Sequence, residues 1–337
     1  MSAPYGDLLA RFRDRRVLVL GDIVADEYLI GRPERLSREA PVLILQYTSS
    51  FVRPGGATNV AYNIAALGAG ASLVGVIGDD EMGRRLRGVL EKAGIRTECL
   101  LTDTSRPTST ATRVLAKGAQ EAQQQVVRID RIDRHPVDGP VLDRMIDQLR
   151  AELESYQALL ISDYENGVIS QEVIDACLPR ARTLDLPVIV DSHGDLFRFK
   201  GVTAATPNQP EAESTLGTRF HDDDDLEAGG RRLVDGMDAC GILITRGSEG
   251  IVLFERDAPT YRIPVALPDN AVVDVTGAGD TVSAVFTLAV SSGATMRDAA
   301  FLSNIAGQAV VQRLGAATLT PRELLDAAAA SPLSRPT

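Results

Sequence analysis

The chain has 337 residues, 44% of them hydrophobic and 24% charged, and a formal net charge of −11. This length and composition are typical of a globular protein with one large domain or two smaller ones. The acidic balance argues against a nucleic-acid partner, because binding to a phosphate backbone depends on Lys and Arg. Trp is absent and only 4% of residues are aromatic, which argues against a stacking platform for single strands.

The cysteines and the N-terminus bear on the cellular compartment. Cys99, Cys177 and Cys240 lie far apart and form no CxxC pair, so we expect neither a disulfide framework nor a metal site built from them. Residues 1–16 are charged and lack the apolar stretch of a signal peptide, and no apolar run reaches the ~18 residues of a membrane span. These features predict a cytoplasmic protein with no membrane association.

Short apolar segments alternate with amphipathic ones along most of the chain. Buried strands are expected at residues 17–22, 71–78, 158–163, 187–191 and 241–245. Helices are expected at residues 59–67, 81–93, 141–153, 171–183 and 226–235. This alternation predicts an α/β fold with a doubly wound sheet flanked by helices. Ligands bind at the carboxyl ends of such strands, and Asp22, Asp163 and Asp191 stand there.

Two stretches, residues 28–52 and 108–130, interrupt this alternation because they are rich in β-formers and show little helical period. Within the second stretch, residues 108–115 and 125–130 are typical of paired strands. We expect both stretches to form a small accessory sheet inserted into a single domain of residues 1–337. The sheet is either a lid over the site or an edge hairpin with no catalytic role.

A glycine-rich turn, Gly55-Gly56-Ala57-Thr58-Asn59, leads into the first long helix. Two glycines allow the backbone to approach a ligand closely, and the amide of Asn59 offers a donor and an acceptor. This combination suits sugar hydroxyls. Arg53 stands beside the turn and is suited to a phosphate.

A second turn, Asp274-Val275-Thr276-Gly277-Ala278-Gly279-Asp280, precedes another apolar helix. The backbone N–H groups of Gly277, Ala278 and Gly279 at a helix start favour an anion, because they lack partners within the helix. A carboxylate beside an anion-binding turn would repel the anion, so its presence there is explained if it must accept a proton. The segment therefore predicts phosphoryl transfer with Asp280 as the general base, and the alternative is an ordinary helix start.

With these two turns the chain resembles the ribokinase (PfkB) carbohydrate kinases. Gly55-Gly-x-x-Asn59, followed by Gly68 and Gly78, is similar to the first signature of that family, and the segment from Asp274 to Asp280 is similar to the second. The resemblance covers residues 15–325. It implies a ribokinase-like fold with a β-sheet lid that often makes a homodimer contact, and it implies ATP and Mg²⁺ as cofactors.

The resemblance also implies roles for individual residues. Asp280 would accept the proton of the attacking sugar hydroxyl, and Gly277, Ala278 and Gly279 would form the anion hole. The residues that would hold sugar hydroxyls are Asp22, Gly55, Gly56 and Asn59.

On the nucleotide side, the resemblance assigns Asn208 and Glu211, in an Asn-x-x-Glu motif, to the organisation of Mg²⁺ and phosphate. Without it, the motif is a helix N-terminus after a proline-containing turn. The phosphates and ribose of ATP would meet a turn that is otherwise only hairpin-like, at Thr245, Gly247 and Gly250, and adenine would meet Asn304. The resemblance further allows a monovalent cation near Asp274 and Thr276.

Among these kinases the chain is most similar to the heptose 7-phosphate kinases, through residues 35–42, 53–57, 162–164 and 274–280. Those enzymes phosphorylate the anomeric hydroxyl and are often fused to an adenylyltransferase, which we do not expect within these residues. Three lysines usual in them are replaced here, within segment 110–113, at Asn166 and within Ser192-His193. Positive charge for a sugar phosphate would then come from Arg38, Arg53, Arg113 and Arg128, some of which are expected to form surface salt bridges instead.

Three hypotheses follow for the function. The first is an ATP-dependent kinase of a heptose 7-phosphate, and the second is a kinase of an unphosphorylated sugar or nucleoside. The third is a sugar- or nucleotide-binding protein without catalysis, which the intact Asp280 and its glycine-rich cradle disfavour.

Overall fold

The computed structural model describes residues 5–118, 123–268 and 271–333, and within them nine strands form one twisted sheet. The strand order is β13-β12-β11-β10-β9-β8-β1-β4-β5. These strands are β1 (Arg16–Gly21), β4 (Gly70–Gly78), β5 (Leu100–Asp103), β8 (Ala158–Asp163), β9 (Val188–Ser192), β10 (Ala204–Ala205), β11 (Gly241–Thr245), β12 (Ile251–Glu255) and β13 (Tyr261–Ile263). Neighbours are parallel from β5 to β11, and β12 and β13 are added antiparallel at one edge.

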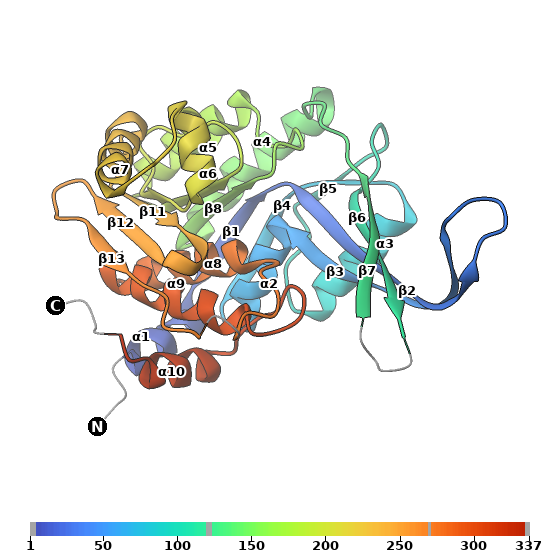
Figure 1. The fold of residues 1–337 in the computed structure, drawn as a ribbon. Helices are drawn as coiled ribbons and strands as arrows, with labels where there is room; N and C mark the ends of the chain where they lie inside the picture. The colour runs from blue at the N-terminus through green and yellow to red at the C-terminus, as the bar shows by residue number, and fades with distance from the viewer. Residues whose placement is uncertain (1–4, 119–122, 269–270, 334–337) are drawn as a thin grey trace.

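Helices cover both faces of this sheet (Figure 1). They are α1 (Gly6–Ala10), α2 (Ala57–Ala66), α3 (Glu81–Lys92), α4 (Gly139–Glu152), α5 (Gln171–Thr183), α6 (Gln209–Leu216), α7 (Asp223–Met237), α8 (Ala278–Ser291), α9 (Met296–Val310) and α10 (Pro321–Ala330). One core cluster includes Phe286 of α8 and Phe301 of α9, and the other includes Met145 of α4 and Met237 of α7. Because both faces are covered, central strands such as β8 are buried along their whole length. The predicted doubly wound α/β fold is confirmed.

The accessory sheet is also present, as four strands in the order β3-β2-β6-β7. They are β2 (Ile23–Leu36), β3 (Leu43–Gly56), β6 (Ser109–Lys117) and β7 (Gln123–Arg131). Figure 1 shows this lid projecting from one side of the main body. Residues 119–122 of the expected insertion lie outside the described residues.

The lid strands extend beyond the expected segment 28–52. The pairing of β2 with β3 begins at Ile23 opposite Gly56 and continues outward from there. Ile23 and Ala25 are buried at the base of the lid, so these strand residues belong to the hydrophobic core as well. This continuity places the Gly55-Gly56 turn where the lid joins α2.

No helix in the described part of the chain is long and apolar enough to cross a membrane.

Candidate active site

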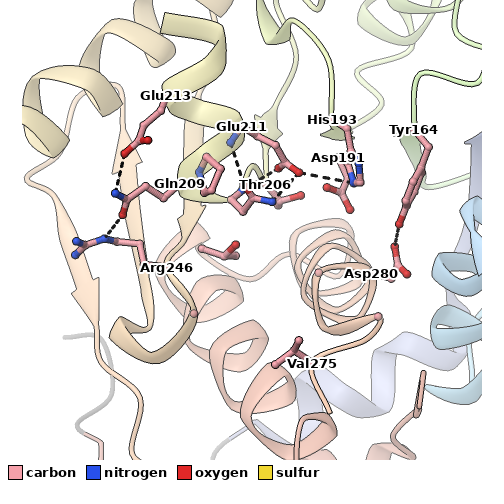
Figure 2. A pocket seen from close by; sticks show the side chains of 16 residues that line it. Tyr164, Asp191, His193, Thr206, Gln209, Glu211, Glu213, Arg246, Val275 and Asp280 are labelled. Atoms are coloured by element: carbon pink, nitrogen blue, oxygen red, sulfur yellow. Dashed lines mark hydrogen bonds and ion pairs between the residues drawn. The ribbon is translucent and has the colours of Figure 1, made fainter. Parts of the chain in front are cut away.

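A cavity of about 640 Å³ opens over the carboxyl ends of the central strands. Its wall brings together segments that are far apart in the sequence (Figure 2). The lining residues are Tyr164, Asp191, His193, Thr206, Asn208, Gln209, Pro210, Glu211, Glu213, Thr245, Arg246, Gly247, Val275, Gly277, Gly279 and Asp280. The position agrees with the general rule for open α/β sheets.

The helix start predicted from the sequence forms one wall of this cavity. Gly277 is the residue before α8 and has a left-handed backbone, with φ of 75°. A Cβ atom at Gly277 would lie 2.7 Å from Nδ2 of Asn59, whereas one at Gly279 would meet nothing within 4 Å. Gly277 is therefore required by conformation and by packing, and Gly279 leaves open space for a ligand.

Gly277 and Gly279 line the cavity, as expected for an anion hole, but Ala278 is not among the lining residues. The N–H group of Ala278 turns back and donates to the carbonyl oxygen of Val275 at 3.2 Å. The N–H groups of Gly279 and Asp280, which follow it, have no acceptor within the helix and lie at the positive end of the helix dipole. These groups are suited to bind a phosphate group.

Asp280 is the buried acid of the site, with 6% of its surface exposed. Its Oδ2 accepts a hydrogen bond from Nδ2 of Asn59 at 2.6 Å, and its Oδ1 accepts one from the hydroxyl of Tyr164 at 2.8 Å. Burial raises the pKa of Asp280 to about 6, although both hydrogen bonds oppose that rise. A carboxylate with this pKa is ionised at neutral pH and can accept a proton.

The Asn-x-x-Glu motif forms the N-terminus of α6. The side chain of Asn208 accepts from the N–H group of Glu211 at 2.9 Å, and the Glu211 carboxylate accepts from the N–H group of Asn208 at 2.7 Å. This capping box fixes both side chains on the cavity wall. The motif is therefore a helix N-terminus whose two side chains also face the cavity, which is compatible with a role in organising Mg²⁺ and phosphate.

Acidic side chains gather on the same wall. Burial is the main cause that raises the pKa of Glu211, and burial with the nearby charges of Asp280 and Glu211 raises the pKa of Asp191 well above its usual value. The Nε2 atom of His193 lies 3.7 Å from Oε1 of Glu211. No group of three or more His, Cys, Asp or Glu side chains in the described residues is arranged to hold a metal ion. Mg²⁺ in such sites is held by one or two carboxylates and the substrate phosphates, and the carboxylate oxygens present here fit that ion.

The turn between β11 and β12 contributes a further part of the cavity wall, next to α6. Thr245, Arg246 and Gly247 line the cavity, whereas Gly250 does not. Gly250 has φ of 87°, and a Cβ atom there would lie 2.1 Å from the carbonyl oxygen of Ile263. Gly250 is thus needed for close packing of the turn against the end of β13.

Asp274 and Thr276 lie just before the helix start. The Asp274 carboxylate accepts from the N–H groups of Thr276 and Gly315, each at 2.9 Å. These hydrogen bonds lower the pKa of Asp274 against the opposing effect of burial. The result is an ionised carboxylate held between two loops, which is compatible with a monovalent cation.

The residues expected to hold sugar hydroxyls converge where the lid meets α2. Gly56 precedes α2 with φ of 54°, and a Cβ atom there would lie 2.7 Å from the carbonyl oxygen of Asp22. A Cβ atom at Gly55 would lie 3.2 Å from Cγ of Asp26. Asn59 donates to Asp280 as described above, so the glycine turn and the base are directly connected.

Asp22 has a role that the sequence did not predict. Its carboxylate accepts from the backbone N–H groups of Tyr164, Asn166 and Val168, at 2.7, 3.2 and 3.3 Å. Burial, together with the charge of Asp163, raises the pKa of Asp22 to about 6 against these bonds. Asp22 therefore ties the loop after β8 to the end of β1, and its contact with a sugar stays a prediction.

The lid arginines differ in how their charge is used. Arg113 pairs with the buried Asp26 at 3.0 Å, and Arg128 pairs with Asp130 at 2.7 Å with 46% of its side chain exposed. The guanidinium of Arg53 lies over the rings of Tyr28 and Phe51, at 5.7 and 5.5 Å from their centroids, and Arg113 also lies over Tyr28 at 5.9 Å. In the described part of the chain, Arg53 has no carboxylate partner.

Asn304 is not among the lining residues of the cavity. It is buried in α9, and its Nδ2 donates to the carbonyl oxygen of Pro264 at 2.9 Å. A contact between Asn304 and adenine stays a prediction.

The sequence placed Asp191 among the acids at the carboxyl ends of strands, and it lines the cavity. Tyr164 belonged to the segment 162–164 that resembles heptose 7-phosphate kinases, but its hydrogen bond to Asp280 was not predicted.

The parallel sheet, the lid and the buried acid at a glycine-rich helix start define an enzyme of the phosphoryl-transfer class that acts on a small molecule. A family model of the pfkB family carbohydrate kinases matches residues 14–323. The chain therefore belongs to the pfkB family of carbohydrate kinases, and the predicted family and enzyme class are confirmed. Membership implies ATP as the phosphoryl donor and a sugar or sugar phosphate as the acceptor.

Curated relatives include the bifunctional protein HldE of Geobacter metallireducens, 41% identical over 319 residues, and that of Pelobacter propionicus, 39% identical over 320 residues. The matches cover 94% and 95% of this chain, which spans 64% of the length of each relative. Solved structures with the same fold include Arabidopsis thaliana ribokinase, with a TM-score of 0.72 and 18% identity over 93% of this chain and 98% of the other. Escherichia coli phosphofructokinase-2 has a TM-score of 0.74 and 18% identity, over 94% of this chain and 98% of the other.

Proposed function

We propose that this enzyme transfers the γ-phosphoryl group of ATP to the anomeric hydroxyl of a heptose 7-phosphate. The observation that carries the proposal is the buried Asp280 carboxylate, held by Asn59 and Tyr164 beside the N-terminus of α8. The similarity to the HldE proteins and the resemblance of residues 35–42, 53–57 and 162–164 to heptose 7-phosphate kinases support this acceptor.

In the proposed reaction Asp280 accepts the proton of the acceptor hydroxyl. The hydroxyl oxygen forms a bond to the γ-phosphorus, and the bond between that phosphorus and the bridging β–γ oxygen breaks, so that ADP leaves. The N–H groups at the start of α8 stabilise the charge on the transferring group. Gly277 and Gly279 are essential to this cradle because one sets the turn and the other leaves space.

The remaining polar groups of the cavity would serve the nucleotide and its ions. Asn208 and Glu211 would organise Mg²⁺, which neutralises phosphate charge when bound, with Glu211 acting indirectly. Thr245 and Gly247 would contact the phosphates and ribose, and the Asp274 carboxylate with Thr276 would hold a monovalent cation.

Of Arg53, Arg113 and Arg128, Arg53 is the one best suited to bind the phosphate of the acceptor. Its guanidinium is held against Tyr28 and Phe51 but is not neutralised by a carboxylate. Arg113 and Arg128 already pair with acids, so they would bind a phosphate only by exchanging partners. Because two of these three arginines are paired with acids, a kinase of an unphosphorylated sugar or nucleoside is the second candidate.

Two further parts of the proposal concern assembly and location. The lid carries exposed apolar side chains on β2, β3 and β7, including Leu43, Tyr47 and Ile129, which are suited to a homodimer contact through the lid. An ATP-dependent reaction on a sugar phosphate fits the cytoplasm, where ATP is available.

The test is ADP release measured with a panel of acceptors, comparing heptose 7-phosphates with the same heptoses lacking phosphate and with nucleosides. The proposal predicts the highest kcat/KM for a heptose 7-phosphate and a product phosphorylated at the anomeric carbon. Faster turnover of an unphosphorylated sugar or nucleoside would favour the second candidate. Binding of sugars without turnover of any acceptor would contradict the assignment of catalysis.

A further inference from the structure

The carboxylate of Asp280 is held from two sides. Nδ2 of Asn59 in α2 donates to one oxygen at 2.6 Å, and the hydroxyl of Tyr164, in the loop after β8, donates to the other at 2.8 Å. Figure 2 shows the Tyr164 hydroxyl directed at the neighbouring Asp280 carboxylate. Because each oxygen has one fixed donor, the orientation of the carboxylate is determined by both, and each oxygen retains lone-pair capacity for a proton.

The loop that carries Tyr164 is itself constrained. Asp22 accepts three of its backbone N–H groups, the first from Tyr164 itself. Glu165 has φ of 57°, a left-handed conformation that is unusual for a residue with a side chain. A Cβ atom at Gly167 would lie 2.1 Å from the carbonyl oxygen of His135. The loop cannot relax without losing these contacts, so the Tyr164 hydroxyl is held at a fixed place.

A neighbouring ring completes the support. The imidazole of His193 packs on the Tyr164 ring with centroids 4.3 Å apart and planes at 43°. Burial and the charge of Asp280 raise the pKa of Tyr164 well above its usual value. The phenol is therefore a donor throughout the physiological pH range, and it is not available as a base.

We propose that Tyr164 is a positioning residue that holds Asp280 in its reactive orientation and stabilises its ionised form. This inference rests on the proposed function, in which Asp280 is the general base. A donor to a carboxylate favours the charged form, so loss of the Tyr164 hydroxyl raises the pH at which Asp280 becomes ionised. Asp22 acts one step further away, through the loop that it anchors.

Other charged groups also face Asp280 and the cavity. The charge of His193, from the segment after β9, lowers the pKa of Asp280, and the charge of Asp26, from β2, raises it. Asp191 of β9 and Glu211 of α6 also line the cavity. These groups stay in place when only the Tyr164 hydroxyl is removed, so Tyr164→Phe isolates the contribution of one hydrogen bond.

The experiment compares wild type, Tyr164→Phe and the matched control Tyr156→Phe. Tyr156 is also buried, and its hydroxyl also donates to a carboxylate, that of Glu152 at 3.1 Å, away from the lining residues of the cavity. Two quantities are measured: the pH dependence of kcat/KM with ATP and the sugar acceptor, and the titration of Asp280 by ¹³C-NMR of labelled aspartate. The Asp280 signal is assigned by its loss in Asp280→Asn.

A general base works when ionised, so wild-type activity is present above about pH 6 and is lost as pH falls through the pKa of Asp280. In Tyr164→Phe we expect the acidic limb of the pH profile and the NMR titration of Asp280 to move upward by about one pH unit. At pH values below the acidic limbs of both proteins, kcat/KM of the variant is then about tenfold lower than that of wild type. Tyr156→Phe leaves both quantities at their wild-type values.

A second variant keeps the ring and the hydroxyl. Difluorotyrosine at position 164 has a more acidic phenol and donates more strongly, so it is expected to move the limb and the titration downward. An unmoved Asp280 titration in both variants, or a uniform loss of rate with an unmoved limb, would overturn the role of Tyr164. A wild-type protein that phosphorylates no sugar would contradict the proposed function, while the NMR titration would still decide the role of Tyr164.

Discussion

The two sides of the active site are built differently. The side around Asp280 and Glu211 is fixed by helix starts, a capping box and hydrogen bonds between buried groups. The side formed by the lid consists of paired strands that project from the main body (Figure 1), with Arg53 lying on aromatic rings. In the proposed reaction, catalysis would therefore depend on the groups held rigidly around Asp280, whereas the choice of acceptor would depend on a few lid side chains.

The largest expected effect is on the rigid side, from Asp280→Asn. The asparagine cannot accept the proton of the acceptor hydroxyl, so kcat is expected to fall by on the order of 10²–10⁴. The KM for ATP should change little, because the N–H groups at the start of α8 remain. Steady-state kinetics at pH 8 check both values, and a variant with kcat close to wild type would mean that Asp280 is not the base.

The next effect comes from Gly277→Ala. The new Cβ atom would meet Nδ2 of Asn59 and the side chain of Ala316, and so displace both the anion cradle and a partner of Asp280. A displacement of about 1 Å near the reacting groups costs on the order of 10² in rate, which sets the scale of the expected loss in kcat.

Gly94→Ala is the matched control for this substitution. Gly94 has φ of 74°, against 75° for Gly277, but a Cβ atom there meets nothing within 4 Å. Both variants lose about 1–2 kcal/mol of stability from the left-handed conformation, measured by denaturant unfolding, and only Gly277→Ala should lose activity. Equal rates in the two variants would contradict a close-packed cradle.

On the lid side, Arg53→Ala tests recognition of a phosphorylated acceptor. A hydrogen bond to a charged group contributes about 1.5–3 kcal/mol, so the KM for a heptose 7-phosphate is expected to rise about 10- to 100-fold. The KM for ATP and the KM for the unphosphorylated heptose should stay near their wild-type values. Equal changes in all three constants would remove the basis for a phosphorylated acceptor.

The smallest effect is expected from Arg128→Ala. Arg128 lies in the same sheet as Arg53 but is ion-paired with Asp130. Its exposed ion pair with Asp130 contributes about 0–1 kcal/mol. The free energy of unfolding, the KM for ATP and the KM for the heptose 7-phosphate should therefore remain close to wild type. A rise in acceptor KM as large as that of Arg53→Ala would show that Arg128 leaves Asp130 to bind substrate.

The sequence was most informative where function depends on backbone. The alternation of apolar and amphipathic segments predicted the sheet, and the small residues between Asp274 and Asp280 predicted the helix start that the structure contains. These features are local, because glycine positions and short apolar runs are determined within a few residues.

The sequence was less informative where function depends on contacts between distant side chains. The bond between Tyr164 and Asp280 joins residues 116 positions apart, and no local pattern signals it. Asp22 stands at the end of a strand, as expected for a ligand-binding acid, yet its carboxylate accepts backbone N–H groups. The pairing of Arg113 with Asp26 likewise depends on the alignment of β2 with β6.

The most direct test of the account is ³¹P-NMR of a reaction that contains the wild-type protein, ATP, Mg²⁺ and a heptose 7-phosphate. The account predicts that ATP is converted to ADP while a second phosphate signal appears on the sugar, coupled to its anomeric proton. With Asp280→Asn the same signal should be nearly absent. A sugar that stays singly phosphorylated in the wild-type reaction, or a product formed equally well by Asp280→Asn, would contradict the account.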